Sequence, residues 1–396
     1  MTSDKPLPFA VPDIGQREID AVVDVLKSRW LTTGQQARRF EEEFAASVGA
    51  THAVALNSCT AALHLSLEAL DVRPGDLVFM SPYTFAATAE VVRYLGATPV
   101  FVDIDPVTLN LDPGRLREAV EARLDARQGR PRAIVPVHIA GVPCDMDAIW
   151  ALARDSGLAV VEDAAHAFPS AYRGRPVGSL PGDIPGTACF SFYATKTITT
   201  GEGGMLVTED QDVADRARSM SLHGLSRQAW TRYAEGGSWA YDIVAAGYKY
   251  NLTDLAAALG IVQLSRAEQM SARRAEIAAA YTRAFARLDA LECPTVPDGV
   301  QTSWHLYLLR LNDWAPIGRD RFIEELNAAG IGTSVHFIPL HLHSYYVSEY
   351  GYAPEDFPVA TAQFRRVVSL PIYSAMSDGD VARVIDATIA AATNAR

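Results

Sequence analysis

The first two-thirds of the chain alternate short apolar runs with longer segments in which apolar residues recur every three or four positions. Apolar runs of about four to eight residues are typical of buried strands, and the longer spacing is typical of one-sided helices. Because the runs are continuously apolar, we expect a parallel sheet covered by helices on both faces. Strands are predicted at 52–56, 77–81, 98–102, 133–138, 158–162 and 188–193, and helices at 60–70, 85–95, 113–124 and 146–156.

The last third of the chain has a different pattern. A long alanine-rich segment with helical spacing, 253–288, is interpreted as a helix that leaves the first domain. After it we predict a strand at 305–311, a helix at 319–329 and a strand at 333–337. The pattern therefore predicts an α/β chain with a large domain over 1–270 and a smaller α+β domain over 271–396.

The composition is that of a globular protein. Of the 396 residues, 49% are hydrophobic and 21% are charged, which provides enough apolar material for a large core. The net charge of −12 argues against a general binder of nucleic acids or membrane surfaces, because both need basic faces. No secretory pattern, no apolar run of ~20 residues and no closely spaced cysteines are present. We therefore expect a cytoplasmic protein.

Reactive residues gather where the predicted strands end, which is where ligands bind in open parallel sheets. Lys196 lies in SFYATKTITTGEGGM (191–205), between a strand and a glycine-rich turn. Burial near apolar residues lowers the pKa of a lysine, and a neutral amine can form a Schiff base with a carbonyl compound. Lys196 therefore suggests a pyridoxal-phosphate (PLP) enzyme. The alternative is a solvated lysine in a glycine-rich loop.

A carboxylate and a histidine follow the strand at 158–162. Asp163 could face the pyridine nitrogen of PLP, because a protonated ring is the better electron sink. His166 could lie over that ring or reach its phenolic oxygen. One alternative is that Asp163 caps a helix while His166 is a buried structural residue. A metal site is another alternative, but no third ligand is spaced nearby.

Two further segments carry candidate binding residues. Ser58, Cys59 and Thr60 begin a helix, and the amides at a helix N-terminus attract phosphate. Capping by Ser58 explains the same pattern without a ligand. Phe85 begins the next helix, where an aromatic ring could stack on a flat cofactor or simply belong to the core.

Other chemistries have little support in the sequence. It contains no P-loop, no dinucleotide-binding fingerprint and no GxSxG elbow. His336, His341 and His343 could suggest a metal, but we expect no metal site there.

Taken together, these segments resemble the DegT/StrS-type family of PLP-dependent nucleotide-sugar aminotransferases. The resemblance covers nearly the whole chain. Its blocks are SRWLTTG (28–34), NSCTAALHL (57–65), SPYTFAAT (81–88), PVHIAG (136–141), VEDAAHA (161–167), SFYATKTITTGEGGM (191–205), GYKYNLTDLAAALG (247–260) and HFIPLH (336–341). The resemblance implies the fold type I aminotransferase architecture, in which a large domain has a mixed, mostly parallel sheet between helices. It also implies a smaller C-terminal α+β domain and a homodimer with shared active sites.

The resemblance also implies a role for each matching residue. Lys196 corresponds to the lysine that binds PLP, Asp163 to the partner of the ring nitrogen, and Phe85 to the stacking aromatic. His166 occupies the position beside that carboxylate. Phosphate contacts are implied for Ser58, Cys59, Thr60, Ser191 and, from the other subunit, Asn251. The substrate side is implied for Trp30, His223, Tyr248, His336 and His341.

The presence of Lys196 and the lack of a cysteine cluster favour transamination over the dehydratases of the same family. The tract 221–233, together with GYKYN, resembles members that aminate C4 of 4-keto-6-deoxy sugars. The expected substrates are therefore a dTDP- or UDP-linked 4-keto-6-deoxyhexose and glutamate. The diphosphate is expected to meet Lys249, Arg227, Arg232 and the substrate-side histidines. A 3-keto sugar aminotransferase, a PLP-dependent sugar dehydratase and a homologue without turnover are the alternatives.

Overall fold

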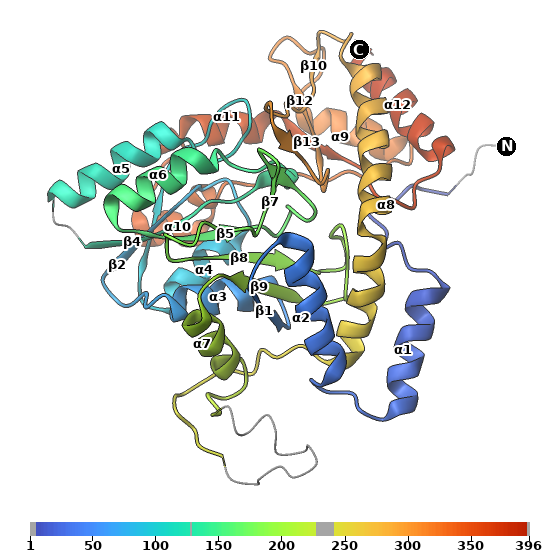
Figure 1. The fold of residues 1–396 in the computed structure, drawn as a ribbon. Coiled ribbons are helices and arrows are strands. Elements are labelled where there is room, and N and C mark those ends of the chain that lie inside the picture. The colour runs from blue at the N-terminus through green and yellow to red at the C-terminus, as the bar shows by residue number, and fades with distance from the viewer. Residues whose placement is uncertain (1–4, 127–128, 227–240, 394–396) are drawn as a thin grey trace.

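The computed structural model describes residues 5–126, 129–226 and 241–393. Its centre is a seven-stranded sheet with the order β1-β9-β8-β5-β4-β2-β3 (Figure 1). The strands are β1 (His52–Leu56), β2 (Asp76–Met80), β3 (Thr98–Phe101), β4 (Arg130–Val135), β5 (Ala159–Asp163), β8 (Gly186–Ser191) and β9 (Gly204–Thr208). All pairs are parallel except those that β9 makes with β8 and β1. The mixed, mostly parallel sheet is confirmed.

The strands are apolar along their whole length because helices cover both faces of the sheet. Every residue of β2, β5 and β9 is buried. On one face lie α3 (Cys59–Ala69), α4 (Ala86–Tyr94) and α7 (Gln211–Ser221). On the other lie α2 (Gln35–Val48), α5 (Pro113–Ala126), α6 (Met146–Ser156) and part of α8 (Asp254–Phe285), with α1 (Gln16–Ser28) against α8 (Figure 1).

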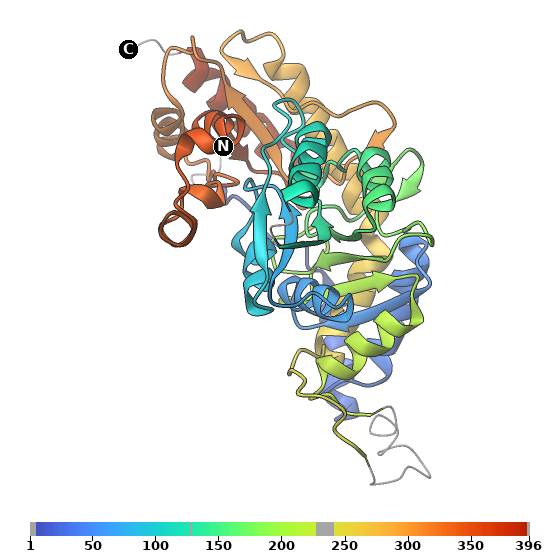
Figure 2. The same ribbon diagram turned by 90° about the vertical axis from the view of Figure 1, so that its left-hand side faces the viewer.

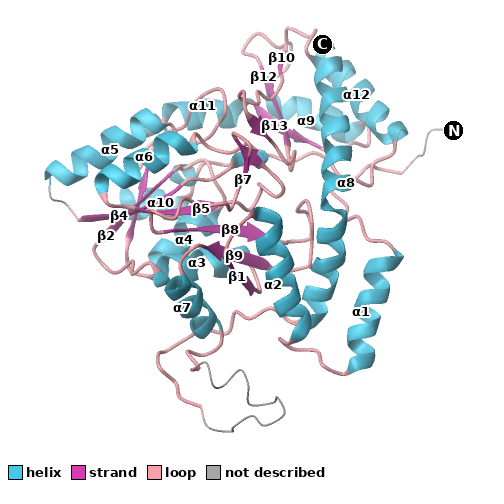
Figure 3. Ribbon diagram, in the orientation of Figure 1, coloured by secondary structure: helices cyan, strands magenta, loops and turns pink. Residues whose placement is uncertain are grey.

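The 32-residue helix α8 runs from beside α2 into the small domain, so the predicted boundary at 270–271 lies inside it (Figures 1 and 2). The small domain has an antiparallel sheet with the order β10-β12-β13 (Figure 3). Its strands are β10 (Leu291–Glu292), β12 (Tyr307–Leu311) and β13 (Val367–Leu370), and its helices are α9 (Arg319–Ala328), α10 (Ser344–Tyr350), α11 (Pro358–Arg366) and α12 (Asp378–Thr393). Within the described ranges, no helix is long and apolar enough to span a membrane.

Six short segments complete the secondary structure of the described residues. The strands β6 (Ala171–Tyr172), β7 (Arg175–Pro176) and β11 (Val300–Gln301) form a third, small sheet. Single turns of 3-10 helix lie at η1 (Ile139–Gly141), η3 (Leu340–Leu342) and η4 (Pro354–Asp356). His341 lies in η3.

The predicted strand at 333–337 is also wrong. Ser334 makes a single antiparallel bridge with Ser369, and the chain bends at His336. The strand that pairs with β12 is β13, which lies near the C-terminal end of the chain. The segment therefore has only one ladder contact, and it passes along the end of β13 toward the large domain.

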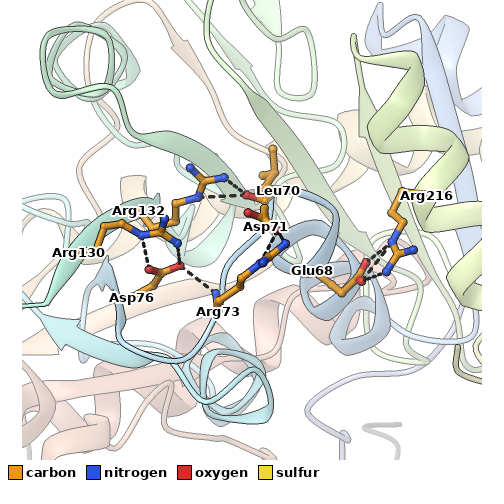
Figure 4. Close-up of polar contacts among 8 residues, drawn as sticks. All are labelled: Glu68, Leu70, Asp71, Arg73, Asp76, Arg130, Arg132 and Arg216. Carbon is orange, nitrogen blue, oxygen red and sulfur yellow. Dashed lines mark hydrogen bonds and ion pairs between the residues drawn. The ribbon is translucent and has the colours of Figure 1, made fainter. Parts of the chain in front are cut away.

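An ion-pair cluster closes the edge of the sheet at which β2 and β4 begin (Figure 4). Asp76, buried at the start of β2, accepts hydrogen bonds of 2.6 and 2.9 Å from Arg130 and one of 2.9 Å from the Arg73 amide. Arg132 donates to the carbonyl oxygen of Leu70 at the end of α3. These contacts fix the connection between α3 and β2 at the edge opposite the end of β5.

Candidate active site

Lys196 lies in the loop between β8 and β9, and pairing of these two strands closes the ends of the loop. The loop leaves β8 after Ser191 and enters β9 at Gly204, and these two residues are paired in the sheet. The Phe192 amide donates a 2.9 Å hydrogen bond to the carbonyl oxygen of Gly203, which extends the pairing by one step. The position of Lys196 is therefore set by the sheet itself.

The surroundings of Lys196 favour a neutral amine. Burial lowers the pKa of Lys196 to about 8, while the nearby Cys59 and Asp163 raise it by a smaller amount. A lysine with this pKa is partly neutral at physiological pH and can act as a nucleophile or base. The half-buried side chain and lowered pKa argue against the alternative of a solvated lysine.

Asp163 is the last residue of β5, and its carboxylate is buried, with 5% of the residue exposed. Its Oδ2 accepts a 2.8 Å hydrogen bond from Thr88 Oγ1, and its Oδ1 accepts one of 3.2 Å from the Ala165 amide. Burial raises the pKa of Asp163, although these hydrogen bonds and the charge of Lys196 lower it. A buried carboxylate with a raised pKa is stabilised in its charged form by a nearby cation, such as a protonated pyridine nitrogen.

Helix α4 supplies two residues of the site. Phe85, its N-cap residue, has a ring that is 62% exposed and lies 6.1 Å from the ring of Phe337. Thr88 lies one turn further and holds Asp163. The sequence reasoning identified Phe85 but missed Thr88. The i, i+3 spacing that places both on one side of a helix was visible in SPYTFAAT.

The N-terminus of α3 forms a narrow cradle. Ser58 caps this 11-residue helix by accepting a 3.1 Å hydrogen bond from the Ala61 amide, as the ligand-free alternative predicted, while its predicted contact with phosphate stays a prediction. A Cβ on Gly204 would lie 2.4 Å from the carbonyl carbon of Ser58 and 2.5 Å from the Cys59 nitrogen. Glycine at 204 thus allows β9 to approach the first turn of α3, which includes Thr60. Ser191 lies nearby at the end of β8, where its Oγ accepts from the Tyr193 amide.

Three histidines, His166, His305 and His336, lie close enough to Lys196 for its charge to affect their pKa values. Burial, and then the charge of Lys196, lower the pKa of His166 and His305 well below the usual range and that of His336 to about 4. His166 Nδ1 accepts a 3.3 Å hydrogen bond from the Ala140 amide, and its ring stacks on Phe337. His305 was not identified from the sequence, because it comes from the start of β12 in the other domain.

The segment that carries Tyr248 and Asn251 lies against the end of β1 of the same chain. Asn251 bridges to Leu56, and its side chain accepts a 2.6 Å hydrogen bond from Lys249 and donates one of 2.7 Å to Thr33. Tyr248 stacks on Tyr250 with their ring planes within 6°. The segment therefore ends beside the cradle, and Lys249 within it is exposed.

The other residues predicted on the substrate side are Trp30, His223 and His341. None of the described contacts joins them to Lys196 or Asp163. Trp30 is exposed and donates from Nε1 to the carbonyl oxygen of Thr33. His223 is exposed, and its amide donates to the carbonyl oxygen of Tyr248. His341 is buried against Thr361, with 3.0 Å between Nε2 and Oγ1. Arg227 and Arg232 lie outside the described residues.

These residues fit PLP on four separate counts. The site offers a nucleophilic lysine, a buried carboxylate whose pKa is raised by burial, an exposed aromatic ring and a helix N-terminus that a Cβ at position 204 would obstruct. Among the residues that the structure describes, no group of three or more His, Cys, Asp or Glu side chains is arranged to hold a metal ion.

Comparisons with known proteins agree with this chemistry. The model of the DegT/DnrJ/EryC1/StrS aminotransferase family matches residues 12–388. The spore coat polysaccharide biosynthesis protein SpsC of Bacillus subtilis (strain 168) is 50% identical over 383 residues, which is 96% of each chain.

Solved structures are similar over nearly the full length. Spr1654 from Streptococcus pneumoniae in its PMP form has a TM-score of 0.88 at 34% identity, covering 98% of this chain and 99% of that one. DesV of S. venezuelae, in complex with a ketimine intermediate, has a TM-score of 0.86 at 34% identity, covering 98% and 100%. These likenesses establish the fold type I aminotransferase architecture. The chain therefore belongs to the DegT/DnrJ/EryC1/StrS family of PLP-dependent sugar aminotransferases.

Proposed function

We propose that this sugar aminotransferase aminates C4 of a nucleotide-linked 4-keto-6-deoxyhexose, carried on dTDP or UDP, with glutamate as the amino donor. The observation that carries the proposal is Lys196, whose lowered pKa and position beside Asp163 suit proton transfer to and from carbon. The position on the sugar rests on the tract 221–233 and on GYKYN at 247–251, which resemble the C4 branch of the family.

Bound PLP supplies an electron sink for the charge that develops on the carbon that loses its proton. Lys196 Nζ, in its neutral form, accepts the proton from Cα of the amino acid and later returns a proton to C4 of the sugar. Asp163 holds the proton on the ring nitrogen of the cofactor, and the Thr88 hydroxyl keeps the carboxylate in place. Each of these roles follows from the pKa or the contact of the residue named.

Three further residues, together with the amides at the start of α3, bind and orient the cofactor in this proposal. Phe85 covers one face of the cofactor ring. His166 donates a hydrogen bond to the cofactor from Nε2, because its Nδ1 already accepts one from the Ala140 amide. Ser58 and the amides at the start of α3 hold the phosphate. The net reaction exchanges the amino group of glutamate for the ketone oxygen of the sugar, giving 2-oxoglutarate and the amino sugar, so no oxidant or reductant is consumed.

We also propose that the active site is shared between two subunits of a homodimer, with Asn251 of the partner subunit reaching the phosphate. The exposed rings of Phe85 and Tyr193 support this proposal, because they leave the site open within one chain. The exposed Lys249 lies beside Asn251 and would then provide a cation for the diphosphate of the substrate. A local cation is needed because the protein as a whole has a net charge of −12.

The test combines purified enzyme, PLP and glutamate with each keto isomer of dTDP- and UDP-6-deoxyhexose. We expect 2-oxoglutarate to form and NMR to locate the new amine at C4. An amine at C3 would replace the C4 assignment with the 3-keto alternative. Loss of a hydroxyl without amine transfer would indicate a dehydratase, and no turnover with any isomer would overturn the substrate class.

A further inference from the structure

A segment of the small domain, residues 302–306, closes over the loop that carries His166. The Ser303 amide donates a 2.9 Å hydrogen bond to Ser170 Oγ, and Ser303 Oγ donates one of 2.6 Å to the carbonyl oxygen of His166. Ser170 in turn donates to the carbonyl oxygen of Gly141. The loop that carries His166 is thus joined by hydrogen bonds to a residue of the other domain.

The same segment places His305 against the His166 ring. The two ring centroids are 4.4 Å apart with a tilt of 44°. The backbone of His305 is fixed from behind, since Arg274 of α8 donates to the carbonyl oxygens of Ile372 and Trp304 at 2.7 and 3.3 Å. His166 therefore has one ring nitrogen bound to Ala140 and one ring face against His305.

Three observations indicate that His305 acts by packing rather than by hydrogen bonding or proton transfer. It is 6% exposed, and its buried Nδ1 has no hydrogen-bond partner among the described residues. Burial, reinforced by the positive charges of Lys196 and Arg274, lowers the pKa of His305 and favours its neutral ring. The Nδ1 of such a ring makes no hydrogen bond that would orient His166, so the contact that remains on this side is the packing of the two rings.

We propose that His305 is a positioning residue of the aminotransferase site: its ring holds His166 in the orientation in which Nδ1 accepts from Ala140 and Nε2 carries the hydrogen offered to the ligand. The inference rests on the role of His166 under the proposed function. It connects the small domain directly to the geometry around the cofactor. Without the His305 ring, the 3.3 Å hydrogen bond from Ala140 and the stacking on Phe337 would be the described contacts left to oppose rotation of the His166 ring.

Two substitutions separate packing from chemistry. His305→Phe keeps an aromatic ring beside His166 and removes the unpartnered nitrogen, whereas His305→Ala removes the ring. We expect His305→Phe to keep kcat within about 3-fold of wild type and His305→Ala to lower kcat about 10-fold or more, with the KM for glutamate nearly unchanged. Tyr307→Phe removes a buried hydroxyl two residues along the same segment, and as the matched control it should behave as wild type.

A readout independent of turnover is nitrogen NMR of ¹⁵N-histidine-labelled full-length protein, without PLP and with PLP, with the His166 signals assigned through His166→Gln. We expect His166 to show the Nε2–H tautomer in wild type, His305→Phe and Tyr307→Phe, and a mixture of tautomers in His305→Ala. An unchanged His166 signal in His305→Ala would overturn the proposal. Loss of activity in His305→Phe with that signal intact would do so as well, because it would make His305 a chemical participant. If His166→Gln is fully active, the role of His166 fails while the NMR result on His305 remains interpretable.

Discussion

Thr88 donates a 2.8 Å hydrogen bond from Oγ1 to Oδ2 of Asp163, so a helix on one face of the sheet holds the carboxylate at the end of a central strand. Thr88 Oγ1 also lies 2.7 Å from Thr84 Oγ1, and all three side chains are buried. The carboxylate thus has a fixed orientation before any ligand arrives, which is what electrostatic stabilisation of a developing charge requires.

The first prediction concerns this pair. Asp163→Asn should retain PLP but lower kcat on the order of 100-fold or more, because an amide cannot keep the ring nitrogen protonated. Thr88→Val, which removes only the hydrogen bond, should cause a smaller loss. Thr208→Val is the control, since Thr208 donates to Gly186 at the far edge of the sheet. Near-normal kcat in Asp163→Asn would contradict the role of the carboxylate.

The second prediction follows from the pKa of Lys196. In the cofactor-free protein, the rate at which PLP forms an imine should rise with pH and level off above about 8, because burial lowers the pKa from 10.5 to about 8. Stopped-flow absorbance would measure this rate. Borohydride followed by peptide mapping should place the label on Lys196. A rate that still rises tenfold per pH unit between pH 9 and 10, or a label on another lysine, would count against the assignment.

The third prediction concerns the approach of β9 to α3. Gly204→Ala should weaken PLP binding at least about 10-fold, because its Cβ would overlap the Ser58–Cys59 peptide and displace the start of α3. Gly182→Ala, at a position with nothing within 4 Å, is the matched control and should bind PLP as wild type does. Equilibrium titration followed by absorbance would give both dissociation constants. Equal affinities would show that the cradle does not bind the phosphate.

The fourth prediction separates stability from activity. Asp76→Ala should lower the free energy of unfolding by about 1–3 kcal/mol near pH 7, because the hydrogen bonds that the buried carboxylate accepts from Arg130 and from the Arg73 amide are lost. The kcat should be unchanged, since Asp76 lies at the opposite edge of the sheet from Asp163. Although burial of Asp76 acts the other way, hydrogen bonds from Arg130 and Arg73 lower its pKa. The deficit should therefore be full above the unfolded pKa of about 4 and shrink as pH falls below it. Urea unfolding at several pH values would measure it.

The fifth prediction tests the shared site. Lys196→Ala and Asn251→Ala homodimers should each be impaired. Mixed dimers should regain activity, because one of their two sites would combine an intact Lys196 with an intact Asn251 of the partner subunit. Activity of co-expressed, differently tagged subunits would measure this recovery. No recovery in purified mixed dimers, or a fully active monomer in sedimentation, would refute the shared site.

Local patterns predicted most of the large domain. The strands at 52–56, 77–81 and 158–162 match β1, β2 and β5 within one residue at each end, because a continuously apolar run reports burial on both faces. The strand β9 was missed, since its apolar run directly follows the glycines of the Lys196 loop and was interpreted as part of a turn. In the small domain, 333–337 has the composition of a strand, but β13 occupies the place beside β12.

The site divides in the same way. Lys196, Asp163 and Phe85 could be found because each lies directly at the end of a strand or the start of a helix. The spacing in SPYTFAAT places Thr88 on the same side of a helix as Phe85, but its contact with Asp163, like that of His305 with His166, is made across the fold and is not encoded in a local pattern. His305 reaches His166 from 139 positions later in the chain, and periodicity carries no information about such a distant contact.

The closed loop between β8 and β9 also acts as a tether. In the proposed reaction, the Lys196 amine would be released from the cofactor in each catalytic cycle. It would then bind the cofactor again, in competition with amines in solution. Pairing of Ser191 with Gly204 keeps that amine within the reach of one side chain, at a local concentration far above millimolar. Cellular amines at ordinary concentrations therefore cannot displace the cofactor unless their own binding sites hold them there, which makes donor selection a matter of binding rather than of amine reactivity.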